Sequence, residues 1–163
     1  LSKQANVELS PITSGPIVDD SFEANVEGIF ACGNVLHVHD LVDYVSEEAA
    51  NAGKNAAIYV KDRYGKDVKK AENIIEIKAT DGARYTVPSS IDLDKMADKL
   101  TVRFRVGAVF KDSYISVYFN DERIMHRKKQ VMAPGEMEQI ILQKKKLVDF
   151  DGLKTITVKI EAE

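Results

Sequence analysis

The sequence predicts an α+β fold in which one strand–helix unit is followed by an antiparallel β-sandwich. An uninterrupted apolar segment at about 28–32 indicates a buried strand, and apolar residues three or four positions apart over about 41–64 indicate a long helix. Beyond residue 71 the apolar residues alternate with polar ones in about seven short segments separated by turn residues, which is typical of a sandwich. We therefore divide the chain into two domains, residues 1–66 and 71–163.

The composition is that of an ordinary globular protein. The chain has 163 residues, of which 44% are hydrophobic, and a formal net charge of −3 with both signs interspersed. This balance argues against a general role in binding nucleic acid or membrane surfaces. Cys32 is the single cysteine, which excludes an intramolecular disulfide and is compatible with a reducing compartment. No apolar run approaches the roughly 18–20 residues of a membrane span, and no signal peptide is evident, so we expect a cytoplasmic protein.

The predicted strand and the residues after it have the form of a ligand-binding turn. The apolar residues of 28–32 run without alternation, which suits a parallel strand covered on both faces. Gly33 lets the backbone approach a ligand closely, and the next helix offers free N–H groups at its start. Such a junction can hold a phosphate, carbonyl or ribityl group. Because the chain supplies few neighbouring strands, a second copy of the chain is one source of cover for this strand.

The long helix has recognisable signals at both ends. Asp40 can serve as its N-cap, with Asp43 three residues later favourable to the helix dipole, and Gly65 predicts its C-terminal stop. Its predicted buried side consists of residues at helical spacing: Leu41, Val45, Ala49, Ala52, Ala56, Val60 and Tyr64.

The pattern of the second domain predicts a succession of strands and tight turns. We place the domain boundary at 65–71, a polar segment that begins with a glycine. The pair Asp81-Gly82 predicts a hairpin turn, and residues 100–106 alternate so that one face is apolar. Further alternation and further turns occur at 75–77, 115–119, 120–121, 134–135 and 156–160. The pattern predicts an antiparallel β-sandwich with an immunoglobulin-like outline.

The N-terminal motif resembles that of a known family. Residues 16–34, which end in Gly28-Ile29-Phe30-Ala31-Cys32-Gly33-Asn34, resemble the second flavin-binding motif of FAD-dependent pyridine nucleotide-disulfide oxidoreductases. The continuation over 35–48 (VLHVHDLVDYVSEE) resembles NAD(P)/FAD-dependent oxidoreductases associated with anaerobic glycerol or glycerol-3-phosphate metabolism. Asn34 stands where that family usually has Asp; an amide still offers an acceptor and adds a donor pair.

The resemblance implies a cofactor and a set of residues that contact it. It implies that 1–66 is the terminal strand–helix piece of a Rossmann-like FAD domain, with NAD(P) bound elsewhere in the parent protein. Gly33 and Asn34 would then contact the flavin ribityl chain, and Leu41 and Val42 would present backbone N–H groups to the flavin ring, with Asp40 at the start of the same helix. The cofactor would perform the electron transfer, so we assign no catalytic residue to this chain.

The rest of the cofactor site is missing from the sequence. No Gly-x-Gly-x-x-Gly fingerprint and no Cys-x-x-Cys pair is present, and the chain begins at Leu1. We therefore expect a C-terminal fragment that is inactive alone and binds FAD weakly or not at all. Its expected partners are the remainder of the parent flavoenzyme, a second copy of the chain, or a redox partner subunit.

His37 and His39 allow three interpretations. They could line the substrate side of the flavin, form structural hydrogen bonds in a loop whose Asp40 caps the helix, or chelate a metal as a His-x-His pair. No further His or Cys lies nearby in the sequence, because the remaining histidine is His126, and we expect no metal site. Cys32 is expected to pack as a small apolar residue.

A different class of function is also compatible with the sequence. The β-sandwich could be a non-catalytic docking or oligomerisation module for a partner subunit. An exposed apolar patch on one sheet would favour this alternative.

Overall fold

The computed structural model describes residues 1–65 and 72–162. Two helices, one short 3-10 helix and eight strands are present in this part of the chain. In chain order they are η1 (Gly33–Val35), α1 (Val42–Asp62), β1 (Ile74–Thr80), β2 (Ala83–Val87), β3 (Ser90–Asp92), β4 (Lys99–Val106), β5 (Phe110–Phe119), β6 (Glu122–Met132), β7 (Glu138–Gln143), α2 (Lys144–Val148) and β8 (Thr155–Glu161).

The strands form two stacked sheets, which confirms the coarse prediction of an α+β chain rich in strands. One sheet has the order β3-β1-β8-β5-β6 and the other the order β2-β4-β7. The prediction of a purely antiparallel sandwich is wrong at one pair, because β1 and β8 run parallel. A parallel pair needs a long connection between its strands, and here the connection contains most of the second domain. The periodicity of each strand carries no information about that pairing.

The main core lies between the two sheets. The alternating residues that the sequence marks as apolar are buried there: Ile75, Ile77, Leu100, Val102, Phe104, Val106, Ile115, Val117, Phe119, Ile156, Val158 and Ile160. The one-face-in pattern predicted for these strands is therefore confirmed. Burial of such side chains supplies about 1.5–3 kcal/mol each and is the main stabilising term of the sandwich.

The predicted turns are present, but one of them connects different elements from those expected. Asn120 has a positive φ in the turn that joins β5 to β6. Asp81 and Gly82 also have positive φ, yet β1 and β2 belong to different sheets. This turn therefore carries the chain from one sheet to the other instead of closing a hairpin.

The strand predicted at 28–32 is absent. Gly28 adopts φ +79°, Phe30 makes a single bridge to Glu23, and the chain then enters η1. A parallel strand needs partner strands on either side, and the described residues place none beside this segment. Its apolar residues are covered in part within the chain, since Phe30 packs edge-on against Tyr59 of α1 at 6.0 Å and Ala31 is buried in a small second core.

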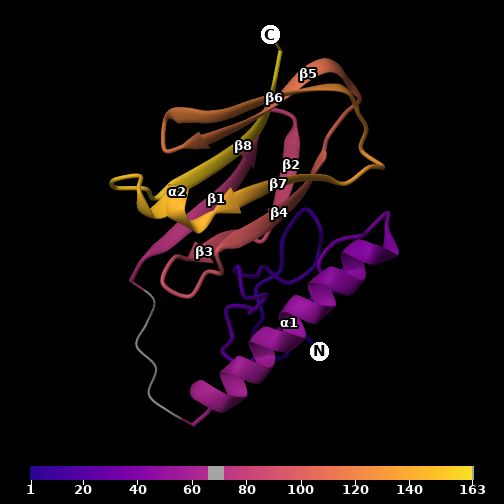
Figure 1. Cartoon of the computed structure of the whole chain (residues 1–163). Helices are drawn as coiled ribbons and strands as arrows, with labels where there is room; N and C mark the ends of the chain where they lie inside the picture. The colour runs from indigo at the N-terminus through magenta and orange to yellow at the C-terminus, as the bar shows by residue number, and fades with distance from the viewer. Residues whose placement is uncertain (66–71, 163) are drawn as a thin grey trace.

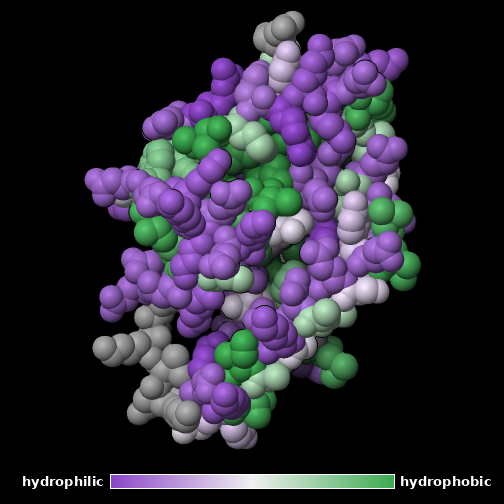
Figure 2. Space-filling model, viewed as in Figure 1, coloured by the Kyte–Doolittle hydropathy of each residue, from purple (hydrophilic) through white to green (hydrophobic). Residues whose placement is uncertain are grey.

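Helix α1 is slightly shorter than predicted and presents a different face to the protein. It covers Val42–Asp62, and Gly65 follows with φ +70°. Of the predicted stripe, Ala52 is buried, whereas Leu41, Ala49, Val60 and Tyr64 are exposed. The other residue of α1 that is buried is a glutamate, Glu48. Figure 2 shows hydrophobic residues among the hydrophilic ones along the outer surface of the helix.

The N-terminal unit packs on the outer face of the three-stranded sheet. Figure 1 shows α1 and the loops of residues 1–41 together on one side of the sandwich, beneath β3 and β4. A second cluster of buried residues joins the two parts, formed by Val18, Phe22, Ala31, Leu36, Ala52 and Val87. Ser89 adds a backbone bond, its N–H donating to Val18 O at 3.0 Å. Most of the predicted domain boundary, residues 66–71, lies outside the described residues.

Candidate functional site

The 3-10 helix η1 and the loop that leads from it to α1 contain most of the residues predicted to bind a ligand. Gly33 has φ +69°, and a Cβ there would lie 3.2 Å from the Val45 side chain of α1. Leu36 closes η1, its N–H donating to Gly33 O at 2.9 Å, and its side chain is fully buried. A glycine is favoured at this position because its backbone is left-handed and close to the helix.

Glu48 of α1 connects this loop to the helix. Its side chain is 1% exposed, and Oε2 accepts the Gly33 N–H at 3.1 Å. Oε1 bonds His37 Nε2 at 3.1 Å. The same oxygen lies 3.0 Å from His39 Nε2, whose side chain is also 1% exposed. That last pair has ion-pair distance without hydrogen-bond geometry, because His39 Nε2 has no hydrogen-bond partner among the described residues.

A buried arginine of the sandwich faces the same carboxylate. Arg103 of β4 is 3% exposed, and its Nη1 lies 3.5 Å from Glu48 Oε1. Its Nη2 pairs closely with Glu47, and its guanidinium lies over the Tyr44 ring, 4.7 Å from the centroid. Both acids and the tyrosine come from the first turns of α1, so Arg103 fixes the start of this helix against the sheet.

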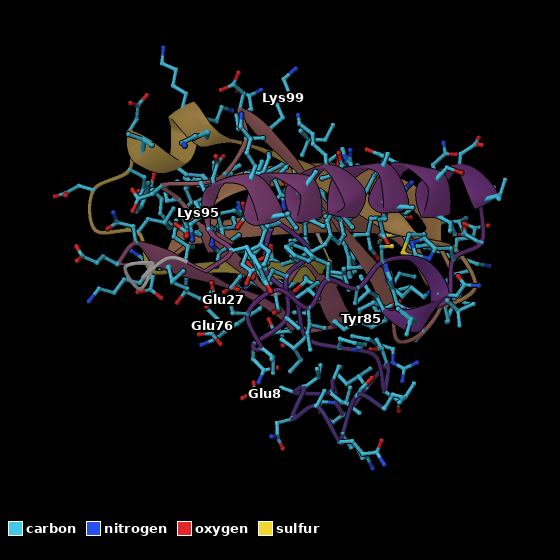
Figure 3. All side chains as sticks on the ribbon, turned by 90° about the horizontal axis from the view of Figure 1, so that it is seen from below. Glu8, Glu27, Glu76, Tyr85, Lys95 and Lys99 are labelled. Carbon is cyan, nitrogen blue, oxygen red and sulfur yellow. The ribbon has the colours of Figure 1, made fainter. Side chains whose placement is uncertain are left out.

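Each histidine is held by a second partner. His37 Nδ1 is 3.3 Å from the Tyr85 hydroxyl of β2, and Tyr85 is labelled in Figure 3 on the side of α1 where the N-terminal loops gather. His39 donates its backbone N–H to Asn34 Oδ1 at 3.1 Å, and its Nδ1 is 3.2 Å from the same oxygen. The two imidazole rings meet edge-on with centroids 4.4 Å apart.

Burial determines the protonation of the cluster. Burial lowers the pKa of His37 below its usual value, although Glu48 opposes the change, so the neutral imidazole is favoured. Burial alone would raise the pKa of Glu48, but its hydrogen bond with His37 and the electrostatic attraction of both histidines outweigh that effect and hold the pKa below its usual value. The cluster therefore contains an ionised carboxylate beside at least one neutral imidazole.

Of the residues predicted to contact a flavin, Gly33 is buried, whereas Asn34, Asp40, Leu41 and Val42 are exposed. Leu41 is the N-cap residue of α1 and makes no side-chain cap, and Val42 is 76% exposed. Asp40 is not the N-cap, which corrects the prediction. Its Oδ2 instead accepts the Met137 N–H at 3.0 Å, and its Oδ1 lies 3.7 Å from Arg105. Cys32 is a free thiol, half-buried, and burial raises its pKa.

The structure brings together residues that the sequence keeps far apart. Glu48, Arg103 and Tyr85 were not among the predicted site residues. Glu48 had one signal, because it falls on the inward side of α1 together with Ala52, where an acid is unexpected. Arg103 and Tyr85 lie on the polar side of alternating strands, so the sequence predicts that they face solvent. They are covered only because the N-terminal unit packs on that side.

No family model matches the chain, and neither the curated proteins nor the solved structures include a match. Among the described residues, none of the helices has the length and apolar character needed to cross a membrane.

Proposed function

We propose that this chain is the C-terminal portion of an FAD-dependent oxidoreductase that transfers electrons between NAD(P)H and an acceptor or substrate. The observation that supports this best is the start of α1. This helix of 21 residues begins without a side-chain cap, and four apolar side chains are exposed around that end: Val35, Val38, Leu41 and Val42. An uncapped helix start with an apolar rim suits a flat, apolar ring whose edge carries carbonyl oxygens.

The residues of the motif fit a flavin in part. Gly33 has a left-handed backbone, but it is buried against α1 and its N–H already donates to Glu48, so it would shape the turn beside the flavin more than bond to it. Asn34 is exposed, but its Oδ1 is already engaged by His39, so only its amide N–H groups remain for a ribityl hydroxyl. Asp40 holds the loop against the sandwich through Met137, so it positions the loop and does not contact the flavin.

FAD, when bound, supplies hydride and single-electron transfer. The task of this chain is to orient the cofactor. Glu48 and Arg103 hold the loop and the first turns of α1 rigidly against β4. The N–H groups of Leu41 and Val42, at the start of α1, would stabilise negative charge at the nearby ring edge. Any NAD(P) site belongs to another part of the parent protein.

A test uses FMN, which contains the flavin ring and ribityl chain without the adenine half. In a titration followed by amide NMR, we expect weak, saturable binding in the millimolar range with the largest shifts at Gly33, Asn34, Leu41 and Val42. Asn34→Ala should weaken binding, whereas Asn51→Ala, an exposed amide further along α1, should not. Shifts confined to other residues, or none at millimolar FMN, would overturn the proposal.

A second function is supported by a groove between the sheet edges. It has a volume of about 120 Å³ and is lined by apolar residues of β5, β6 and β7. Ile141 is 60% exposed beside it, and Ile124 is also exposed. This patch favours the docking-module alternative, in which the sandwich binds a partner subunit. Ile141→Lys should abolish capture of that partner and leave FMN binding unchanged; equal loss of both would contradict a separate docking role.

A further inference from the structure

His39 Nε2 is a buried nitrogen that has no hydrogen-bond partner among the described residues. Asn34 Oδ1 accepts the His39 backbone N–H, so it is an acceptor, and the His39 Nδ1 beside it at 3.2 Å must carry a proton. In a neutral imidazole the other nitrogen, Nε2, then presents a lone pair. That lone pair lies 3.0 Å from Glu48 Oε1, which is itself an acceptor.

Two acceptors at this distance repel each other unless a proton or another cation lies between them. A second proton on His39 Nε2 would be poorly directed, because no hydrogen bond forms there among the described residues. Arg103 does not resolve the conflict, since its Nη1 is 3.5 Å from Glu48 Oε1 and its short contact is with Glu47. A cation bound by both atoms would remove the repulsion.

The arrangement of the three side chains suits a metal ion. His37, His39 and Glu48 each offer one ligand atom, and these atoms lie within 4.8 Å of one another. The carboxylate oxygen is 3.1 Å from His37 Nε2 and 3.0 Å from His39 Nε2. Two ligands bound to zinc at about 2.0–2.1 Å and at tetrahedral angles are about 3.3 Å apart. Small movements of the side chains would admit the ion.

Each of the three side chains also has an outer partner on its other polar atom. His37 Nδ1 meets the Tyr85 hydroxyl at 3.3 Å, and His39 Nδ1 meets Asn34. Glu48 Oε2 accepts the Gly33 N–H. Such partners fix the tautomer and orientation of metal ligands and are a regular feature of metal sites.

We propose that His37, His39 and Glu48 bind a divalent transition-metal ion of the zinc type. Two imidazoles and one carboxylate favour such an ion over Mg²⁺ or Ca²⁺, which prefer oxygen ligands. The charges allow it: with both imidazoles neutral, Glu47 (−1), Glu48 (−1) and Arg103 (+1) sum to −1. The proposal depends on the arrangement of these donors and does not require a bound flavin.

The test is a titration of the chelator-treated full chain with Co²⁺, followed by visible absorption, and then displacement of Co²⁺ by Zn²⁺. We expect one ion per chain and the intense visible band of tetrahedral cobalt. His39→Gln should weaken binding about 100-fold or more, and Asn34→Ala, which removes only an outer partner, about 10- to 100-fold. His126→Gln changes the one histidine outside the cluster and should have no effect.

Two outcomes would overturn the metal proposal. One is the absence of saturable binding. The other is equal affinity in the wild type, His39→Gln and Asn34→Ala, which would place the ion elsewhere on the chain. Circular dichroism of each variant shows whether it is folded. If His39→Gln does not fold, Asn34→Ala decides the outcome, because Asn34 is an exposed residue of η1.

Discussion

Replacement of Glu48 by alanine should be among the most destabilising single changes in the chain. The substitution removes the acceptor of the Gly33 N–H and of His37, and it removes one of the two acids that face the buried Arg103. A buried N–H group left without a partner costs about 1–3 kcal/mol. Breaking a buried ion pair costs about 3–5 kcal/mol when no other partner remains. Because Glu47 still neutralises Arg103, we expect a total loss of about 4 kcal/mol.

The assay is urea denaturation in the presence of a chelator, followed by circular dichroism, so that any metal contribution is absent. Glu47→Ala is the matched control: its side chain is half exposed, and we expect a loss of about 1 kcal/mol or less. Glu48→Gln keeps an acceptor for Gly33 and should fall between the two. If Glu48→Ala costs no more than Glu47→Ala, the idea that Glu48 joins the loop, α1 and β4 is wrong.

Two further predictions concern a pair of glycines and one aspartate. A Cβ on Gly15 would lie 2.1 Å from Leu36 O, whereas a Cβ on Gly53 of α1 would have nothing within 4 Å. Gly15→Ala should therefore lower the free energy of unfolding by about 1–3 kcal/mol, and Gly53→Ala should raise it by about 0.5–1 kcal/mol. Urea denaturation that gives the two variants similar stability would refute the contrast. Burial raises the pKa of Asp20 to about 7 from a usual 3.8, although the Asp92 N–H that it accepts opposes the change. The folded state therefore binds more protons than the unfolded state between these values, so stability should fall by at most about 4 kcal/mol as the pH rises from about 4 to about 7. Asp20→Asn should remove that slope, and an unchanged pH profile in the variant would contradict the raised pKa.

Much of the sandwich could be predicted from the sequence, because alternation within a strand shows which side chains face a core. The positions of Val102 and Phe104 follow from that rule and are confirmed. The parallel pairing of β1 with β8 does not follow from it, since the period of a strand is the same in parallel and antiparallel sheets. The missing strand at 28–32 has a similar cause: an apolar run shows that a segment is buried, but not by what.

The candidate site divides in the same way. The sequence by itself determined that Gly33, His37 and His39 lie in one loop before a long helix, because they are neighbours in the chain. Only the tertiary structure decided that His37 meets Glu48 and Tyr85, 11 and 48 positions further along the chain, and that Glu48 meets Arg103, 55 positions beyond it. The polar side of β2 and β4 would face water in an isolated sandwich, and packing of the N-terminal unit on that side turns exposed polar residues into a buried cluster. Local periodicity cannot encode this contact, because it arises from the fit between two surfaces whose residues are far apart in the sequence.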